Sequence, residues 1–209
     1  MNSVLKMFFH NVFITFLSFI LLQMPKRLII ISHGVTGSAN SCWIQWLKNL
    51  LANETTEVVT PSYPNSDDPE YPVWKDCFNE ILLNNEYEEL FVIGHSLGGF
   101  FTLKLLGDFL FENPKLKGVV LVAPTSIKRP ERRRFYTEAI NWENVRKVNC
   151  PINLLFSDDD PKISVDHIKL ILSELKDKQN LEYRNYQNLG HFIVTESHEV
   201  LDAAKSILN

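Results

Sequence analysis

The sequence predicts an α/β protein with a single, mainly parallel and doubly wound sheet of about six strands. Two observations support this prediction. Short, continuously apolar runs, typical of strands buried on both faces, alternate along the chain with longer amphipathic runs at helical spacing. Such alternation predicts βαβ units, whose right-handed crossovers place helices on both faces of one sheet. The 209-residue chain shows no internal repeat, low-complexity tract or linker, so we expect one domain.

The first half of this domain begins with the apolar run at 28–31, which is a buried-strand pattern. Residues 41–52 follow with tryptophan and leucine at helical spacing, and a short strand pattern comes at 57–60. Four prolines then predict an irregular loop, at positions 61, 64, 69 and 72. A helix is expected at 73–83, and the second strongly apolar strand at 90–93.

The second half continues the same alternation. Residues 97–111 are apolar nearly all round, so this helix should be central in the fold. The remaining strands are expected at 119–122, 152–156 and 181–186, and the remaining helices at 165–175 and 199–208. The charged stretch at 128–144 is predicted to be an excursion from the sheet, and no insertion is long enough to form a large lid domain.

Residues 1–23 differ in composition from the domain at 24–209. They hold one charged residue, Lys6, and five of the fourteen phenylalanines. As a helix, the 16 residues at 7–22 would span roughly 24 Å, short of a hydrocarbon core of roughly 30 Å, and no A-x-A-like cleavage site follows. Three interpretations stay open: an extension that is dispensable, or non-native because translation starts at Met24; a signal or membrane-anchoring segment; or a helix packed on the domain.

Composition and charge limit the kinds of binding partner and the cellular compartment that we expect for this protein. With 21 basic and 25 acidic residues the net charge is −4, which gives no reason to expect a nucleic-acid partner. Three cysteines without a C-x-x-C pair argue against a disulfide framework and a Cys-rich zinc site. We expect a monomer, and any contact with a membrane would be made through residues 1–23 alone. It would be cytoplasmic if translation starts at Met24, and secretory or membrane-associated if residues 1–23 are native.

The strongest motif is Gly94-His95-Ser96-Leu97-Gly98, between the strand at 90–93 and the helix at 97–111. G-x-S-x-G at a strand-to-helix turn is the nucleophile elbow, in which the turn lifts the serine hydroxyl off the end of the sheet. Side chains in place of the two glycines would clash with the neighbouring strand or helix. The helix N-terminus directs its free N–H groups and positive dipole end to the same place. This context predicts that Ser96 is a nucleophile.

A second motif, Ser32-His33-Gly34, follows the first strand. In folds with this elbow, the loop here donates a backbone N–H to the oxyanion hole, and the residue after the nucleophile supplies another. We therefore expect the N–H groups of Val35 and Leu97 to form the oxyanion hole. His33 itself is expected to be structural.

A nucleophilic serine needs a base, and the base needs an orienting carboxylate later in the chain. Three candidates, Asp158, Asp159 and Asp160, follow the strand at 152–156, at the end of the sheet where catalytic groups collect. Pro161 biases Asp160 to an extended conformation that would direct it toward the base, with Asp158 and Asp159 nearer solvent or the helix cap. Asp159 remains the alternative acid.

His191 is the expected base, because it follows the last strand and Gly190 permits a sharp loop before it. The other histidines fit the role less well. His10 lies in the prefix, His33 at a strand end, and His95 on the elbow turn, where we expect it to point away. The two that remain are in helical stretches, namely His167 and His198.

Taken together, these residues resemble an α/β-hydrolase, and more narrowly the small serine hydrolases of the retinoblastoma-binding protein 9 and YdeN type. The resemblance runs from about Met24 to Leu208. Its landmarks are His33-Gly34, Trp43 or Trp46, Gly94-His95-Ser96, Trp142-Glu143, Asn149-Cys150-Pro151, Asp159-Asp160-Pro161 and Gly190-His191-Phe192. The resemblance implies a nucleophile at Ser96, an acid at Asp160 and a base at His191, on a short sheet without a large lid.

The chain departs from the family pattern in two places. The apolar prefix has no counterpart, and the glycine usual three residues before the catalytic acid is Ser157 here. The Leu-x-Cys-x-Glu pocket-binding motif is absent, so no retinoblastoma-type partner is implied.

The expected activity is hydrolysis of a carboxylic ester, a thioester or a small amide through an acyl-enzyme. The substrate is a small acyl compound whose binding residues the sequence does not specify, and no metal or cofactor is expected. Two alternatives stay open: acyl transfer on the same residues, and a non-catalytic hydrolase-fold interaction module.

Overall fold

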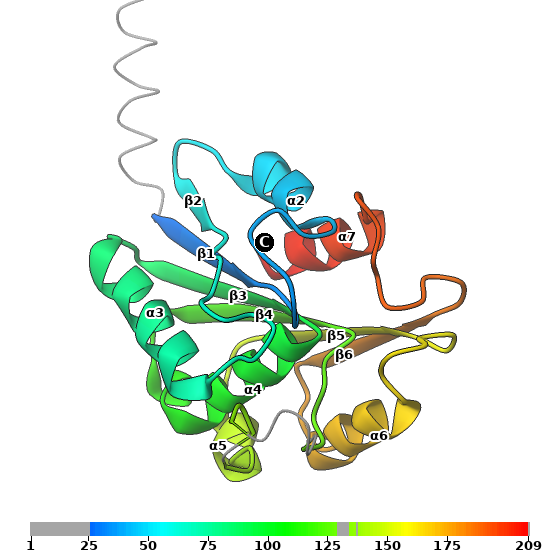
Figure 1. Ribbon diagram of the computed structural model, residues 1–209. Coiled ribbons are helices and arrows are strands. Elements are labelled where there is room, and N and C mark those ends of the chain that lie inside the picture. The colour runs from blue at the N-terminus through cyan, green and yellow to red at the C-terminus, as the bar shows by residue number, and fades with distance from the viewer. Residues whose placement is uncertain (1–25, 129–133, 137, 209) are drawn as a thin grey trace, which may run out of the picture.

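Six parallel strands form the centre of the computed structural model, which describes residues 26–128, 134–136 and 138–208 (Figure 1). The strands are β1 (Arg27–Ser32), β2 (Thr56–Val59), β3 (Glu89–His95), β4 (Leu116–Val122), β5 (Ile152–Ser157) and β6 (Leu181–Tyr186). Their order in the sheet is β2-β1-β3-β4-β5-β6. The predicted six-stranded, doubly wound sheet is therefore confirmed.

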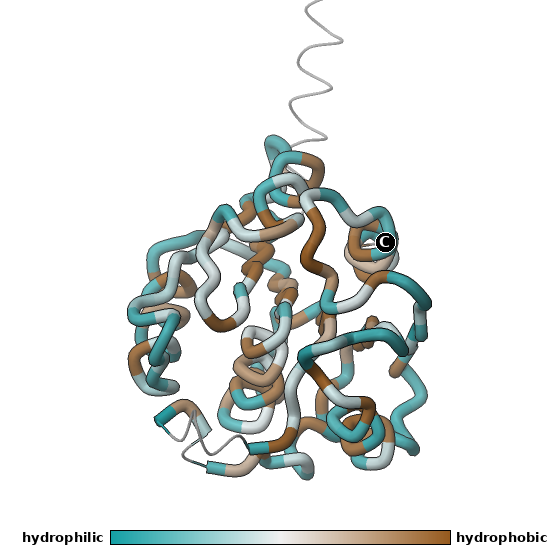
Figure 2. Tube along the Cα trace, turned by 45° about the vertical axis from the view of Figure 1, so that its right-hand side comes forward, coloured by the Kyte–Doolittle hydropathy of each residue, from teal (hydrophilic) through white to brown (hydrophobic). Residues whose placement is uncertain are grey.

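The helices cover both faces of this sheet. They are α2 (Ile44–Leu51), α3 (Tyr71–Asn84), α4 (Leu97–Asp108), α5 (Trp142–Lys147), α6 (Val165–Glu174) and α7 (His198–Ile207). Figure 1 shows α2 and α7 on one face and α3 to α6 on the other. Each face buries its own apolar cluster, and the most apolar segments run through the middle of the molecule, with hydrophilic segments around them (Figure 2). The helix α4 is buried along nearly its whole length, as its sequence predicts.

Two of the differences between the observed and the predicted helices have a clear local cause. The central helix ends at Asp108 rather than at 111, because Phe109 leaves the helical region with φ −155° and a 3₁₀ turn, Leu110–Glu112, follows. Leu110 is still fully buried in that turn, so the apolar pattern continues past the end of the helix. The stretch predicted as an excursion ends in the short helix α5, whose Asn141 side chain accepts the N–H of Asn144 as an N-cap. Six residues are too few for periodicity to reveal a helix.

The expectations for residues 1–23 lie outside the described residues. Within the described ranges, no helix is both long enough and apolar enough to cross a membrane.

The strand order determines where a site can form. From β1 the chain moves outward to β2, and then returns past β1 to β3 and on to β6 in the other direction. At such a switch point the connections leaving β1 and β3 diverge to opposite faces, which opens a crevice at the carboxyl ends of these strands. The two Gly-containing motifs follow β1 and β3, so both are at this crevice.

Candidate active site

The turn between β3 and α4 holds Ser96 in a strained conformation, with φ 56° and ψ −117°. Non-glycine residues rarely adopt this region, and it persists only where the surroundings enforce it. The Ser96 N–H donates to the Val122 carbonyl at 2.9 Å, which ties the turn to β4. A Cβ at Gly98 would lie 2.3 Å from the Ser32 carbonyl oxygen, so only glycine lets α4 pass β1 this closely. The elbow geometry expected from the motif is present.

The loop after β1 packs against this turn. A Cβ at Gly34 would lie 2.9 Å from the Ser96 Cβ, so the two loops are in contact. Val35 follows Gly34 and lines the same pocket as Ser96, whereas Leu97 is the first residue of α4. In the described part of the chain neither the Val35 nor the Leu97 N–H has a protein acceptor, so both remain candidates for binding an oxyanion.

His33 holds the loop together and is fully buried. Its Nδ1–H donates to the Gly34 carbonyl at 2.7 Å, and its Nε2 accepts the Tyr63 N–H at 3.0 Å. Burial lowers the pKa of His33, which keeps the ring neutral and able to accept this bond. Both ring nitrogens are used in these contacts, which agrees with the structural role expected for His33.

The structure brings Asp160 and His191 together at the end of the sheet. The His191 Nδ1–H donates to Asp160 Oδ2 at 2.7 Å, and both side chains are almost completely buried. The other carboxylate oxygen accepts the backbone N–H groups of Lys162 at 2.8 Å and Ile163 at 3.0 Å. Burial acts to raise the pKa of the Asp160 carboxyl, but these hydrogen bonds outweigh it and lower the pKa overall. Asp160 is thus held ionised beside His191.

The neighbouring carboxylates have other partners. Asp158 accepts a hydrogen bond from the Asn185 side chain on β6 at 2.7 Å. Asp159 accepts the Ser157 hydroxyl at 2.5 Å and the Gly190 N–H at 3.0 Å. Both are exposed, but neither is simply solvated, because each is hydrogen-bonded to a neighbouring segment.

Ser96 and His191 face one pocket of about 620 Å³ at the crevice. Its wall includes loop residues that follow β1, β5 and β6, namely Gly34, Val35, Thr36, Gly37, Ser41, Cys42, Pro161, Lys162, Ile163 and Ile193, together with His95. Cys42, Lys162 and Ile193 were not predicted as site residues. Lys162 could have been suspected from its place directly after Asp160 and Pro161, whereas nothing in the sequence around Cys42 indicates that it lines a pocket with Ser96.

His95 is the histidine whose position differs from expectation. Its ring does not point away from the site but lies 5.0 Å from the His191 ring, and its Nε2–H donates to the His191 carbonyl at 2.9 Å. Burial, and secondarily the charge of His191, lower the pKa of His95 to about 4. The two remaining histidines of the described residues have structural contacts, whereas His10 lies outside the described residues. His167 Nδ1 accepts the N–H groups of Ser126 and Ile127, and the His198 ring packs against that of Trp46.

The buried His95 predicts that the protein loses stability on acidification. The folded chain takes up a proton at His95 only near pH 4, whereas the unfolded chain does so near its ordinary pKa of 6.5. The contribution of His95 to stability is therefore nearly complete above about pH 6.5 and is lost as the pH falls toward 4, by about 2 to 3 kcal/mol at pH 4.5. A His95→Gln variant keeps an amide donor but cannot titrate. Guanidinium unfolding at pH 7 and pH 4.5 should show a smaller loss in the variant by about that amount, and equal losses would contradict this assignment.

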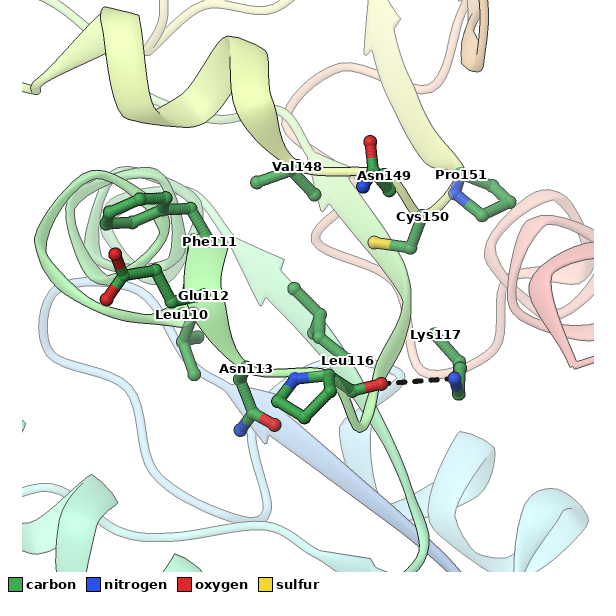
Figure 3. A pocket seen from close by; sticks show the side chains of 11 residues that line it. Leu110, Phe111, Glu112, Asn113, Leu116, Lys117, Val148, Asn149, Cys150 and Pro151 are labelled. Atoms are coloured by element: carbon green, nitrogen blue, oxygen red, sulfur yellow. Dashed lines mark hydrogen bonds between the residues drawn. The ribbon is translucent and has the colours of Figure 1, made fainter.

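A second pocket of about 440 Å³ lies away from the motifs, between the 3₁₀ turn after α4 and the starts of β4 and β5 (Figure 3). Its labelled residues include Cys150, whose pKa burial raises to about 11, and Lys117, whose ammonium donates to the Pro114 carbonyl at 3.1 Å. Parallel sheets bind ligands at the carboxyl ends of their strands, and this pocket is at the amino ends. Across the described residues no group of three or more potential metal-binding side chains occurs.

Comparison with known proteins identifies the family. The family model for serine hydrolases matches residues 29–209. The chain belongs to the serine hydrolase family. The rat (Rattus norvegicus) serine hydrolase RBBP9 is 26% identical over 189 residues, which cover 88% of this chain and 95% of the relative. The resemblance to this type of hydrolase is thereby confirmed.

Solved structures show the same fold. The ydeN gene product of B. subtilis superposes on this serine hydrolase with a TM-score of 0.73 at 21% identity, over 88% of this chain and 98% of that one. Est1E from Butyrivibrio proteoclasticus gives a TM-score of 0.66 at 16% identity, over 88% of each chain. The chain therefore has the α/β-hydrolase fold.

Proposed function

We propose that this serine hydrolase cleaves small carboxylic esters through an acyl-enzyme on Ser96, with His191 as the general base and Asp160 as the orienting acid. The observation that supports the proposal best is the 2.7 Å hydrogen bond between His191 and Asp160 at the wall of the pocket that contains the elbow serine. A nucleophile, a base and an acid that orients the base form the arrangement that activates a serine hydroxyl.

The proposed reaction has two halves. His191 Nε2 takes the proton of the Ser96 hydroxyl as Oγ attacks the ester carbonyl, and the imidazolium then protonates the departing alcohol. In the second half, His191 takes a proton from water, the hydroxide attacks the acyl-enzyme, and the proton returns to Ser96 as the acid leaves. The buried carboxylate of Asp160 stabilises the imidazolium in both halves. The N–H groups of Val35 and Leu97 would bind the oxyanion, and each such donor contributes roughly 3 kcal/mol to the transition state.

The pocket wall supports a small substrate. Apart from the two histidines, none of the described wall residues is aromatic, and most of them are small or polar. The apolar part of this wall consists of a few aliphatic and other small side chains, so we expect short acyl groups to be preferred. The structural relatives described as esterases are consistent with an ester as substrate.

A labelling experiment tests the proposal directly. A fluorophosphonate should modify the full-length protein once, with the added mass on the peptide that contains Ser96. A series of p-nitrophenyl esters of increasing chain length, beside aminoacyl amides, should then show turnover that is fastest for short esters. Absence of labelling and turnover would favour the non-catalytic module. Transfer of the acyl group to an added alcohol, faster than release of the free acid, would favour an acyltransferase.

A further inference from the structure

The loop at 187–193, here called the histidine loop, carries His191 in a conformation that its own residues do not favour. Three of its residues have left-handed backbones, with φ 64° at Asn188, 49° at Gly190 and 54° at Phe192. Two of these are not glycine, and such a combination persists only where surrounding contacts hold it. The position of the His191 ring therefore depends on what anchors this loop.

Two anchors act at and after His191 itself. The Phe192 ring is buried in the apolar cluster beneath α2 and α7, and the His191 carbonyl accepts the Nε2–H of His95. These contacts hold the carboxyl-terminal side of the histidine loop. They leave open what holds its amino-terminal side, where the chain arrives from the exposed edge strand β6.

Ser157 and Asp159 form the anchor on that side. The Ser157 hydroxyl donates to Asp159 Oδ1 at 2.5 Å, and its oxygen accepts the Leu189 N–H at 3.3 Å. The same Asp159 oxygen accepts the Gly190 N–H at 3.0 Å. Two consecutive N–H groups just before His191 are thus bound by a hydroxyl and a carboxylate that are themselves hydrogen-bonded to each other.

This arrangement depends on the side chain of residue 157. Ser157 is the last residue of β5 and is buried, so its hydroxyl has a defined position next to the end of β6. A residue without a side-chain hydroxyl at this position could neither donate to Asp159 nor accept the Leu189 N–H. The hydroxyl of Ser157 is therefore a direct contact between the end of β5 and the loop that carries the base.

We propose that Ser157 and Asp159 are a pair of positioning residues that hold the histidine loop so that His191 reaches Ser96. Neither residue contacts the reacting atoms in this proposal, which rests on the proposed serine mechanism. The Asp160 side chain orients the imidazole ring of His191. Ser157 and Asp159 instead bind the backbone just before His191 and so determine where that residue lies. A displacement of about 1 Å at a reacting group is enough to lower turnover by up to about 100-fold.

The test compares Ser157→Ala and Asp159→Ala with Asp158→Ala. The last variant is the matched control, because it removes the same charge from the adjacent residue, whose carboxylate binds Asn185 on β6 and not the loop. On one p-nitrophenyl ester we expect kcat to fall roughly tenfold in Ser157→Ala and in Asp159→Ala, with KM within about twofold. The rate of fluorophosphonate labelling should fall by the same factor, and Asp158→Ala should match wild type.

Two further variants separate positioning from a general structural role. Asp159→Asn keeps an oxygen that accepts the Ser157 hydroxyl and the Gly190 N–H, so its kcat should stay within about threefold of wild type. The double variant Ser157→Ala with Asp159→Ala should lose little more than either single one, because both act through one contact. Asp159 is exposed, so its variants should fold even if a change at the buried Ser157 lowers the melting temperature.

Three outcomes would contradict the positioning role of Ser157 and Asp159. They are equal kcat in Asp159→Ala and Asp158→Ala, losses of kcat that multiply in the double variant, and an effect of the substitutions on KM alone. These outcomes are distinct from a failure of the proposed function, in which Ser96→Ala would retain hydrolysis and labelling.

Discussion

Replacing Ser96 by alanine is expected to lower kcat for ester hydrolysis by about 10⁵-fold or more and to abolish fluorophosphonate labelling. The alanine has no oxygen to form the acyl-enzyme, so only the hydrolysis that the binding pocket can promote with water remains. The substitution should be tolerated by the fold, because alanine keeps the Cβ and adds no atoms to the tight turn before α4.

The Ser96→Ala measurement combines single-ester kinetics, labelling and a thermal melt. Ser173→Ala, an exposed serine on α6, is the matched control and should retain wild-type kinetics. Labelling of Ser96→Ala at the wild-type rate would exclude Ser96 as the nucleophile.

The Asp160→Asn variant is expected to lower kcat by about 10⁴-fold, whereas Asp158→Asn and Asp159→Asn should lie within a few-fold of wild type. Asp160 is the carboxylate that accepts the His191 Nδ1–H, and its negative charge would stabilise the imidazolium formed in each step. An amide has the same shape but no charge, and its NH₂ group favours the wrong tautomer of the ring.

The three asparagine variants remove equal charge from three successive residues. Differences in kcat among them therefore reflect the contacts of each carboxylate and not the overall electrostatic field of the protein. Measurement of kcat on one ester across the set decides between the two candidate acids. A crippled Asp159→Asn enzyme beside a nearly normal Asp160→Asn enzyme would move the acid by one position and would also contradict the assignment of Asp159 as a backbone anchor.

Much of the fold follows from patterns that act locally along the chain. Continuously apolar runs need burial on both faces, and this predicts β1, β3, β4 and β5 at nearly their observed positions. The edge strand β6 is mostly exposed, and its strand pattern is weaker for that reason. The short helix α5 escaped detection, because periodicity needs more residues than the six it contains.

For the candidate site too, local sequence motifs predicted the residues, whereas the contacts between them are seen only in the structure. Ser96, Asp160 and His191 were predicted from motifs, because a strand-to-helix turn, a strand end before proline and a Gly-His loop each have a local signature. The structure brings Asp160 and His191 into hydrogen bonding and places Ser96 and His191 on one pocket. Their catalytic roles stay predictions until the variants above are measured.

The sequence by itself determined the class of fold, the elbow and the candidates for the catalytic residues, with the choice of acid left between Asp159 and Asp160, since steric and periodic constraints act among residues close along the chain. Only the tertiary structure decided which partner each of the three consecutive aspartates binds and where the ring of His95 lies. It also decided that Cys42 and Lys162 line the same pocket as Ser96. These contacts join segments that are up to about a hundred residues apart in sequence. Such contacts depend on the distance and direction between side chains in the folded protein, and a local sequence pattern does not contain this information.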